Sequence, residues 1–196
     1  MAISPLLNPS IPHPPGDCKH LGIFWIFLVF LGENCYTVSV KGDMYMIYVA
    51  PSAVVTGQVE LSEHVNLWHG AVLRGDSGQI TVGEGTNIQE HCVLHEKTTV
   101  GAYCTVGHRA ILHGCTIGEE TLIGMGSIVL NGAKIGPRCM VGAGSLVTGK
   151  MDAPEGSLIL GSPAKVIRPL TQEEIAALKE DALQYIRLAE ESLPQK

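Results

Sequence analysis

Aliphatic side chains recur at every sixth position along the middle of this chain. They run in three in-phase groups: Val49, Val55, Leu61, Leu67 and Leu73, then Val82, Ile88, Leu94, Val100, Val106 and Leu112, then Ile117, Ile123, Val129, Ile135, Val141 and Val147. Small residues follow most of them four positions later, and glycine often follows directly. A period of six fits neither a helix nor an alternating strand. It predicts an all-β fold, a parallel β-helix in which each hexad forms one short strand and one corner.

Three hexads of six residues make one triangular coil of 18 residues, and successive coils stack at about 4.8 Å. The aliphatic residue points inward, and the small residue fits the tight corner. The spacing breaks twice, with a step of nine residues from Leu73 to Val82 and a step of five from Leu112 to Ile117. We expect the extra residues around 75–79 to bulge from the coil, and loops that leave a rigid scaffold often carry function.

Three histidines occupy offsets that suit a metal site. His95 and His113 are 18 residues apart, and each directly follows an inward aliphatic residue. They are therefore expected to stack on neighbouring coils about 5 Å apart, close enough to share one ion with metal–nitrogen bonds of about 2.0–2.1 Å. His108 falls at another phase of the coil, so a threefold assembly would be needed to bring it to the pair of a neighbouring subunit. Zinc suits such a set, and Fe²⁺ or Co²⁺ could occupy the same ligands.

The stretch 66–114 resembles the gamma-class carbonic anhydrase family of the hexapeptide-repeat superfamily, and the wider match runs from about residue 49 to 168. The matching segments are Arg74-Gly75-Asp76, Asn87-Ile88-Gln89, Val93-Leu94-His95, Val106-Gly107-His108 and Leu112-His113-Gly114-Cys115. The resemblance implies a left-handed β-helix that assembles as a homotrimer with metal sites between subunits. His95 and His113 would then come from one chain and His108 from the next.

The resemblance also implies roles for four more residues. Arg74 and Asp76 match a pair that links subunits beside the site. Gln89 matches a residue that orients the metal-bound solvent or bicarbonate, and Asn87 matches another residue lining the site. The implied reaction is reversible hydration of carbon dioxide to bicarbonate by a metal-bound hydroxide, because such a metal lowers the pKa of its water to near 7.

One departure from the family pattern bears on the rate of this reaction. Strongly active members carry glutamates as proton shuttles, but Ser77 takes the place of the first, and the segment 96–99 leaves no room for the acidic loop that carries the second. Glu96 could serve as a substitute. The sequence therefore predicts a metal site more firmly than fast turnover, and slow hydration is expected.

Two other functions remain open at this point. The segment 161–165 (Gly-Ser-Pro-Ala-Lys) resembles hexapeptide acyltransferases that use acyl-coenzyme A. The same segment occurs in carbonic anhydrase-like relatives, so it does not discriminate between the two activities. The third interpretation is a non-catalytic metal-binding or scaffold trimer with a vestigial site.

Composition limits the binding partners and the cellular compartment that are expected for this protein. The chain has 196 residues and a net charge of −6, and it lacks a basic cluster, which argues against nucleic-acid binding. Cys92, Cys104 and Cys139 fall at small corner positions and are interpreted as buried thiols, which fits a reducing, cytoplasmic compartment. The apolar run 23–31 is too short to span a bilayer, which needs about 20 residues, so membrane association is not expected.

The pattern divides the chain into three parts. Residues 45–168 form the metal-binding β-helix, and residues 169–196 form a C-terminal α-helix, where Thr171 and Glu174 make a capping box. Residues 1–44 are proline-rich and then apolar, and they do not fit the repeat. We expect this segment to be atypical for the family and outside the core, as a misplaced start codon or a frameshift would produce.

Overall fold

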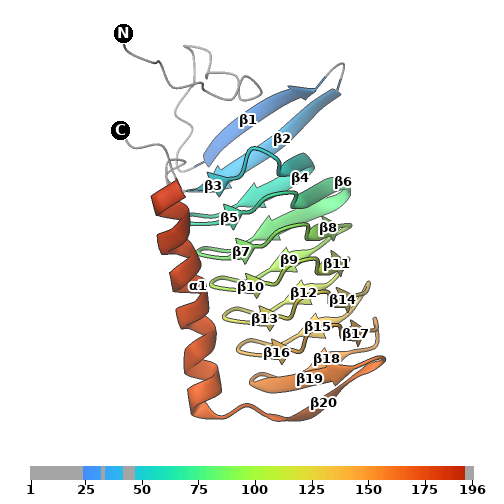
Figure 1. Ribbon diagram of the computed structural model, residues 1–196. Coiled ribbons are helices and arrows are strands. Elements are labelled where there is room, and N and C mark those ends of the chain that lie inside the picture. Colours follow the sequence, from blue (N-terminus) through green and yellow to red (C-terminus); the bar gives the residue numbers. More distant parts are fainter. Residues whose placement is uncertain (1–23, 32–33, 42–46, 193–196) are drawn as a thin grey trace.

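The computed structural model describes residues 24–31, 34–41 and 47–192. Within these ranges the chain forms a parallel β-helix with the long helix α1 (Gln172–Ser192) along one side (Figure 1). The structure therefore confirms the predicted fold class, a β-helix of hexapeptide repeats followed by a C-terminal helix.

Short strands from successive coils stack into the walls of the β-helix. One wall contains β6 (Val72–Val82), β8 (Val93–His95), β11 (Ile111–His113), β14 (Ile128–Val129) and β17 (Leu146–Val147). A second contains β9 (Thr99–Val100), β12 (Thr116–Ile117), β15 (Lys134–Ile135) and β18 (Asp152–Ala153). β6 turns the corner between these walls, since its first residues pair with β8 and its last with β9.

The third wall is a separate sheet. It contains β3 (Tyr48–Val49), β5 (Asn66–Leu67), β7 (Asn87–Ile88), β10 (Thr105–Val106), β13 (Leu122–Ile123), β16 (Met140–Val141), β19 (Ser157–Gly161) and β20 (Ala164–Pro169). Its last two strands form an antiparallel hairpin that ends the β-helix. Helix α1 contacts β3, β5, β7 and β10, so it covers this wall.

Neighbouring coils keep the predicted register at the histidines. β8 and β11 pair so that Leu94 lies beside Leu112 and His95 beside His113. The predicted bulge is present as well. β4 (Val54–Leu61) pairs with β6, and the offset between paired residues rises from 18 to 21 between Gly57 and Val59. The extra residues of β6 therefore leave the ladder beside β8.

The core consists of the inward aliphatic residues together with the corner cysteines. Leu73, Leu94, Leu112 and Ile123 are fully buried, and each such side chain contributes about 1.5–3 kcal/mol by leaving water. Among the described residues, the free cysteines Cys92, Cys104, Cys115 and Cys139 are all buried. Burial raises the pKa of Cys92, Cys104 and Cys115 to about 12, so these thiols stay protonated at neutral pH. Cys92, Cys104 and Cys139 are buried, as the sequence predicted for these corner positions.

The predicted capping box starts helix α1. The Thr171 backbone N–H donates to Glu174 Oε2 at 2.8 Å, and the Glu174 N–H donates to Thr171 Oγ1 at 3.2 Å. Arg168 also donates two hydrogen bonds of 2.7 Å to the Glu174 carboxylate. The bond from Arg168 is the main reason that the pKa of Glu174 falls to about 2.

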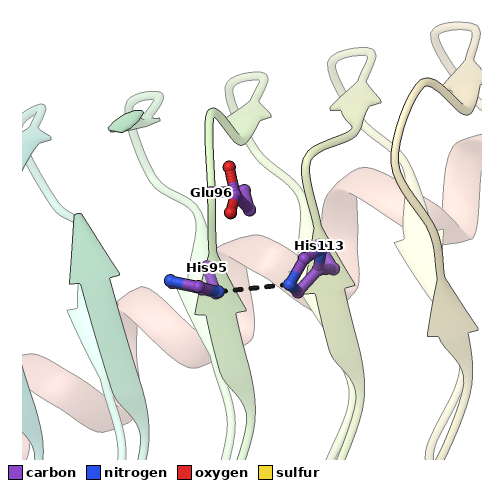
Figure 2. Close-up of side chains that lie close together, drawn as sticks. All are labelled: His95, Glu96 and His113. Atoms are coloured by element: carbon purple, nitrogen blue, oxygen red, sulfur yellow. Dashed lines mark hydrogen bonds between the residues drawn. The ribbon is translucent and has the colours of Figure 1, made fainter. Parts of the chain in front are cut away.

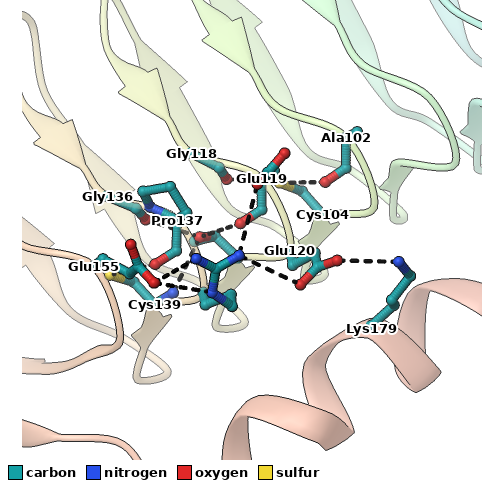
Figure 3. A network of polar contacts seen from close by, with 12 residues as sticks. Ala102, Cys104, Gly118, Glu119, Glu120, Gly136, Pro137, Cys139, Glu155 and Lys179 are labelled. Atoms are coloured by element: carbon teal, nitrogen blue, oxygen red, sulfur yellow. Dashed lines mark hydrogen bonds and ion pairs between the residues drawn. The ribbon is translucent and has the colours of Figure 1, made fainter.

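A set of ion pairs, here called the ion-pair edge, connects the helix to the coils. Arg138 lies 3.6 Å from Glu119 and 4.0 Å from Glu120, and it also contacts Glu155 (Figure 3). Lys179 of α1 donates to Glu120 at 3.1 Å. Positive and negative side chains therefore alternate along this edge.

Two further strands precede the β-helix. β1 (Phe24–Leu31) pairs antiparallel with β2 (Asn34–Lys41), and β2 runs parallel to β4 with Val38 beside Val59. The rest of the predicted 1–44 segment, residues 1–23, 32–33 and 42–44, lies outside the described residues, as do 45–46 and 193–196. The division of the chain into three parts stays a prediction. No helix of the described ranges is long and apolar enough to cross a membrane.

Candidate metal centre

His95 and His113 stand side by side on the outer surface of β8 and β11 (Figure 2). His95 Nδ1 lies 3.1 Å from His113 Nε2, and the two ring centroids are 5.0 Å apart. The ladder places them there because each follows an inward leucine on neighbouring coils. The stacked pair is therefore present as the sequence predicted.

The spacing of these two nitrogens fits a shared ion. Two nitrogen ligands at about 2.0–2.1 Å from a tetrahedral ion lie about 3.3 Å apart. The observed 3.1 Å between His95 Nδ1 and His113 Nε2 is close to that value. A divalent cation such as Zn²⁺ therefore fits the donor set and the separation of this pair.

The bulge of β6 brings three polar side chains to His95. Asp76 Oδ1 lies 3.1 Å and Ser77 Oγ 3.0 Å from His95 Nε2. Arg74 Nη2 lies 2.8 Å from the same nitrogen. Desolvation opposes ionisation of Asp76, but hydrogen bonds with His95 and Ser77 and the charge of Arg74 outweigh it, so its pKa lies below the ordinary value.

Glu96 also approaches the pair. The ligand atoms of His95, Glu96 and His113 lie within 4.8 Å of one another, and within the described part of the chain no other set of three metal-ligating side chains is this close. Figure 2 shows the Glu96 carboxylate above the gap between the two rings. Glu96 is thus placed where it can accept a proton from the site.

Asn131 contacts His113 from the next coil, and the sequence reasoning missed it. Its Oδ1 lies 2.6 Å from His113 Nδ1. It stands 18 residues after His113, the same interval that separates His113 from His95. A search at that interval on both sides of each candidate ligand would have found it.

His108 lies elsewhere, in the corner after β10, close to the predicted site residues Asn87 and Gln89. Its Nδ1 lies 2.6 Å from Glu90 Oε2, a contact that the sequence reasoning also missed although Glu90 is 18 residues away. The His108 backbone N–H donates to Gln89 Oε1 at 3.2 Å, and Gln89 Nε2 donates to Asn87 Oδ1 at 3.1 Å. Asn87 in turn donates to Thr105 Oγ1 at 2.8 Å.

Aromatic side chains adjoin this second cluster. The Trp68 ring lies 5.1 Å from that of Tyr48 and 5.7 Å from that of Tyr185 of α1. Burial first, and then the negative charge of Glu90, raise the pKa of both tyrosines. Trp68 directly follows Leu67, which pairs with Ile88, so it stands one coil from Gln89.

The predicted residues thus fall into two groups on one chain. The pair half-site comprises Arg74, Asp76, Ser77, Glu96, His95, His113 and Asn131, and the single-histidine half-site comprises Asn87, Gln89, Glu90 and His108. The first lies on β6, β8, β11 and the corners after β8 and β14, and the second on β7 and the corners after β7 and β10, in another sheet. His108 is outside the set of ligand atoms around His95 and His113.

Known proteins resemble this chain over most of the β-helix. Residues 114–149 match the family model described as bacterial transferase hexapeptide (six repeats). A probable carbonic anhydrase from Methanocaldococcus jannaschii is 47% identical, and the match covers 74% of this chain and 93% of that protein. The mitochondrial gamma carbonic anhydrase 1 of Arabidopsis thaliana is 42% identical over 73% of this chain and 56% of its own length.

A solved structure agrees with these matches. A hexapeptide transferase family protein from Anaplasma phagocytophilum superimposes with a TM-score of 0.75 and 42% identity, covering 80% of this chain and 94% of that one. The resemblance inferred from the histidine segments is confirmed by these relatives, of which the chain covers 93% of the Methanocaldococcus protein and about half of the Arabidopsis one. The chain belongs to the gamma-class carbonic anhydrase-like family of hexapeptide-repeat proteins.

Proposed function

We propose that this protein is a carbonic anhydrase-like lyase, which reversibly hydrates carbon dioxide to bicarbonate at a divalent metal between subunits. The observation that carries the proposal is the pair of ring nitrogens, His95 Nδ1 and His113 Nε2, held 3.1 Å apart at the outer surface. Relatives at 42–47% identity are named carbonic anhydrases, which supports the same activity.

A homotrimer is the assembly that we propose, because the two half-sites complement each other. The pair half-site offers two metal ligands, and the single-histidine half-site offers one more. A cyclic assembly would place His108 of each subunit against the pair of the next and would make equivalent sites. Exposed apolar side chains support such contacts: Leu130 precedes Asn131, and Met125, 58% exposed, precedes Gly126, whose N–H donates to the His108 carbonyl.

Zinc is the proposed ion, with Fe²⁺ or Co²⁺ as alternatives for the same ligands. When bound, such an ion supplies a water with a pKa near 7. The protein's own side chains would then orient the attacking solvent and accept its proton. Gln89 is held by Asn87 and by the His108 backbone, so its amide is fixed where it can orient the attacking solvent and bicarbonate. Arg74 and Asp76, 3.7 Å apart, would link adjacent subunits beside the site.

Proton export is the step that we expect to limit the rate. The Glu96 carboxylate has a ligand atom within 4.8 Å of those of both His95 and His113, so Glu96 would act in place of the missing acidic loop. Ser77 stands 3.0 Å from His95 Nε2 and donates to Asp76, so it can relay a hydrogen bond but is a weak base. Hydration is therefore expected to be slower than in members that carry both glutamates.

The cytoplasm is the compartment that we propose, because the chain keeps buried free thiols at Cys92, Cys104, Cys115 and Cys139. The net charge of −6 argues against nucleic acid as a partner.

Acyl transfer is a second candidate, favoured by the transferase names of the matching family model and of the Anaplasma structure. It leaves the close histidine pair without a role, so we rank it lower. Release of free coenzyme A from acetyl-coenzyme A would test it directly. A metal-loaded trimer inactive in both assays would support a binding or scaffold role instead.

The decisive experiment mixes inactive variants. His108→Ala and His113→Ala damage different half-sites, so mixed trimers would regain one complete site each, giving about a quarter of wild-type carbon dioxide hydration after random reassembly. The matched control mixes His95→Ala with His113→Ala, which damage the same half-site and should regain nothing. Equal activity in the two mixtures would contradict a site shared between subunits.

A further inference from the structure

We infer that Asn131 is a positioning residue, whose side-chain carbonyl holds His113 in the tautomer that leaves Nε2 free for a divalent cation. The inference rests on the proposed metal site. It concerns how this chain prepares a ligand before any ion arrives.

The hydrogen bond between the two side chains determines which ring nitrogen carries the proton. A neutral imidazole has one N–H and one lone pair. Asn131 Oδ1, 2.6 Å from His113 Nδ1, is an acceptor, so the hydrogen belongs on Nδ1. The lone pair then lies on Nε2, the atom 3.1 Å from His95 Nδ1. The nitrogen that faces the gap is therefore the one able to bind a cation.

The backbone leaves room for this contact at Gly114. This residue has φ +62°, and a Cβ placed on it would lie 2.4 Å from Asn131 Nδ2 and 2.9 Å from Asn131 Cγ. Any larger residue would push the amide away from His113. The Gly114 N–H, which lies within hydrogen-bonding reach of the His95 carbonyl and of Thr98 Oγ1, anchors the corner itself.

The short corner of the repeat explains why Asn131 reaches His113. In β11 and β14, Leu112 pairs with Val129, an offset of 17 residues. Asn131 is 18 residues beyond His113, so it lies one position past strict register. The step from Leu112 to Ile117 is five residues instead of six, and with this shorter coil the Asn131 Oδ1 lies at His113 Nδ1.

His108 has an acceptor of the same kind but of different charge. Its Nδ1 contacts the Glu90 carboxylate at 2.6 Å, the same distance as at Asn131. Two of the three candidate ligands, His108 and His113, thus have Nδ1 hydrogen-bonded to an oxygen, which directs the lone pair to Nε2. Hydrogen-bond partners of this type orient the metal-binding imidazole, and removing one typically lowers the metal affinity 10–100-fold. The neutral amide at position 131 does this without adding a negative charge to the pair half-site.

The test compares Asn131→Leu, which cannot accept a hydrogen bond, with Asn131→Asp, which can only accept. Lys134→Leu is the matched control, an exposed residue of β15 on the same coil. The first readout needs no metal: ¹⁵N NMR of the imidazole rings in metal-free protein. His113 should be protonated on Nδ1 in the wild type, in Asn131→Asp and in Lys134→Leu, and should shift toward Nε2 protonation in Asn131→Leu.

The second readout is the dissociation constant for Co²⁺ and Zn²⁺ in the intact protein, with thermal unfolding of each metal-free variant as a check on folding. Asn131→Leu should bind the ions about 10–100-fold more weakly, and Asn131→Asp at least as tightly as wild type. If Asn131→Leu is folded and keeps both the wild-type tautomer and the wild-type affinity, the inference is wrong. If the wild type itself binds no metal, the proposed function fails, while the NMR result still decides the role of Asn131.

Discussion

The pair half-site and the ion-pair edge are built by the same stack of coils but satisfy their polar groups differently. At the ion-pair edge, Arg138 lies within 4.0 Å of Glu119 and Glu120, and Lys179 compensates Glu120 from the helix (Figure 3). At the pair half-site, two ring nitrogens point at each other across 3.1 Å. Stacking supplies closeness in both places. The residue types decide whether the groups neutralise one another or are able to take up a cation from outside.

The difference extends to what each region contributes. The ion-pair edge is partly exposed, and exposed pairs contribute little to stability because water and salt screen them. The pair half-site gains further stability when an ion is bound, because ligand binding favours the folded state. The first region should therefore respond to salt and the second to metal, and the following substitutions test that division.

The largest effect is expected from the core that both regions share. Leu112 is fully buried directly before His113. Leu112→Ala leaves a cavity and should lower the free energy of unfolding by about 3 kcal/mol. Chemical denaturation would measure the loss, which should appear with and without metal. If only the metal-loaded protein lost stability, Leu112 would support the pair half-site alone and not a core that both regions share.

Removal of a metal ligand should separate binding from stability. His95→Ala is expected to weaken metal binding beyond about 100-fold and to abolish hydration activity, since a ligand matters more than its hydrogen-bonding partner. The metal-free protein should lose less than about 1 kcal/mol of stability, because the ring lies outside the core. Titration calorimetry and unfolding of the same sample would report both quantities. Tight metal binding by this variant would place the ion elsewhere.

Two glycines allow the strain of a corner to be separated from its function. Gly114 has φ +62° and Gly144 φ +68°, but only Gly114 has the Asn131 amide in the way of a side chain. Each substitution by alanine should cost about 1–2 kcal/mol from the left-handed backbone alone. Gly114→Ala should cost more and should also weaken metal binding. Equal losses in stability and unchanged metal affinity would refute the proposed tie between this corner and the site.

The smallest effect is expected at the ion-pair edge. Arg138→Met keeps the aliphatic part of the side chain and removes the charge that faces Glu119, Glu120 and Glu155. Tm should fall by less than in Gly144→Ala, and the difference from wild type should shrink in high salt. Metal affinity should not change. A fall in metal affinity would show that the two regions are coupled.

The repeat allowed much of this structure to be predicted. Six-residue spacing is set by one inward side chain for each strand, so period, core and coil length follow from the aliphatic residues alone. The stacking of His95 on His113 follows from the same count. The three inserted residues after Gly75 were visible as a broken spacing, and they place Asp76 and Ser77 at His95.

Other features depend on atoms that a spacing does not describe. Glu90 and Asn131 contact His108 and His113 through side-chain conformations, and Asn131 does so one position out of strict register. A search at the interval of 18 residues would have found both residues. It would not have shown which ring nitrogen each one contacts. Whether His108 reaches a neighbouring pair is a property of an assembly, which the described residues of one chain do not contain. That part of the site stays a prediction.

Helix α1 has a consequence for how the molecule comes apart. A stack in which each coil touches only its neighbours can fray from either end, one coil after another. Here the chain returns after the last coil, and α1 runs back to contact β10, β7, β5 and finally β3 (Figure 1). The last part of the chain thereby braces the first coil, so the terminal coils cannot loosen without releasing the helix. A linear array becomes a cooperative unit, which keeps the spacing between stacked histidines steady.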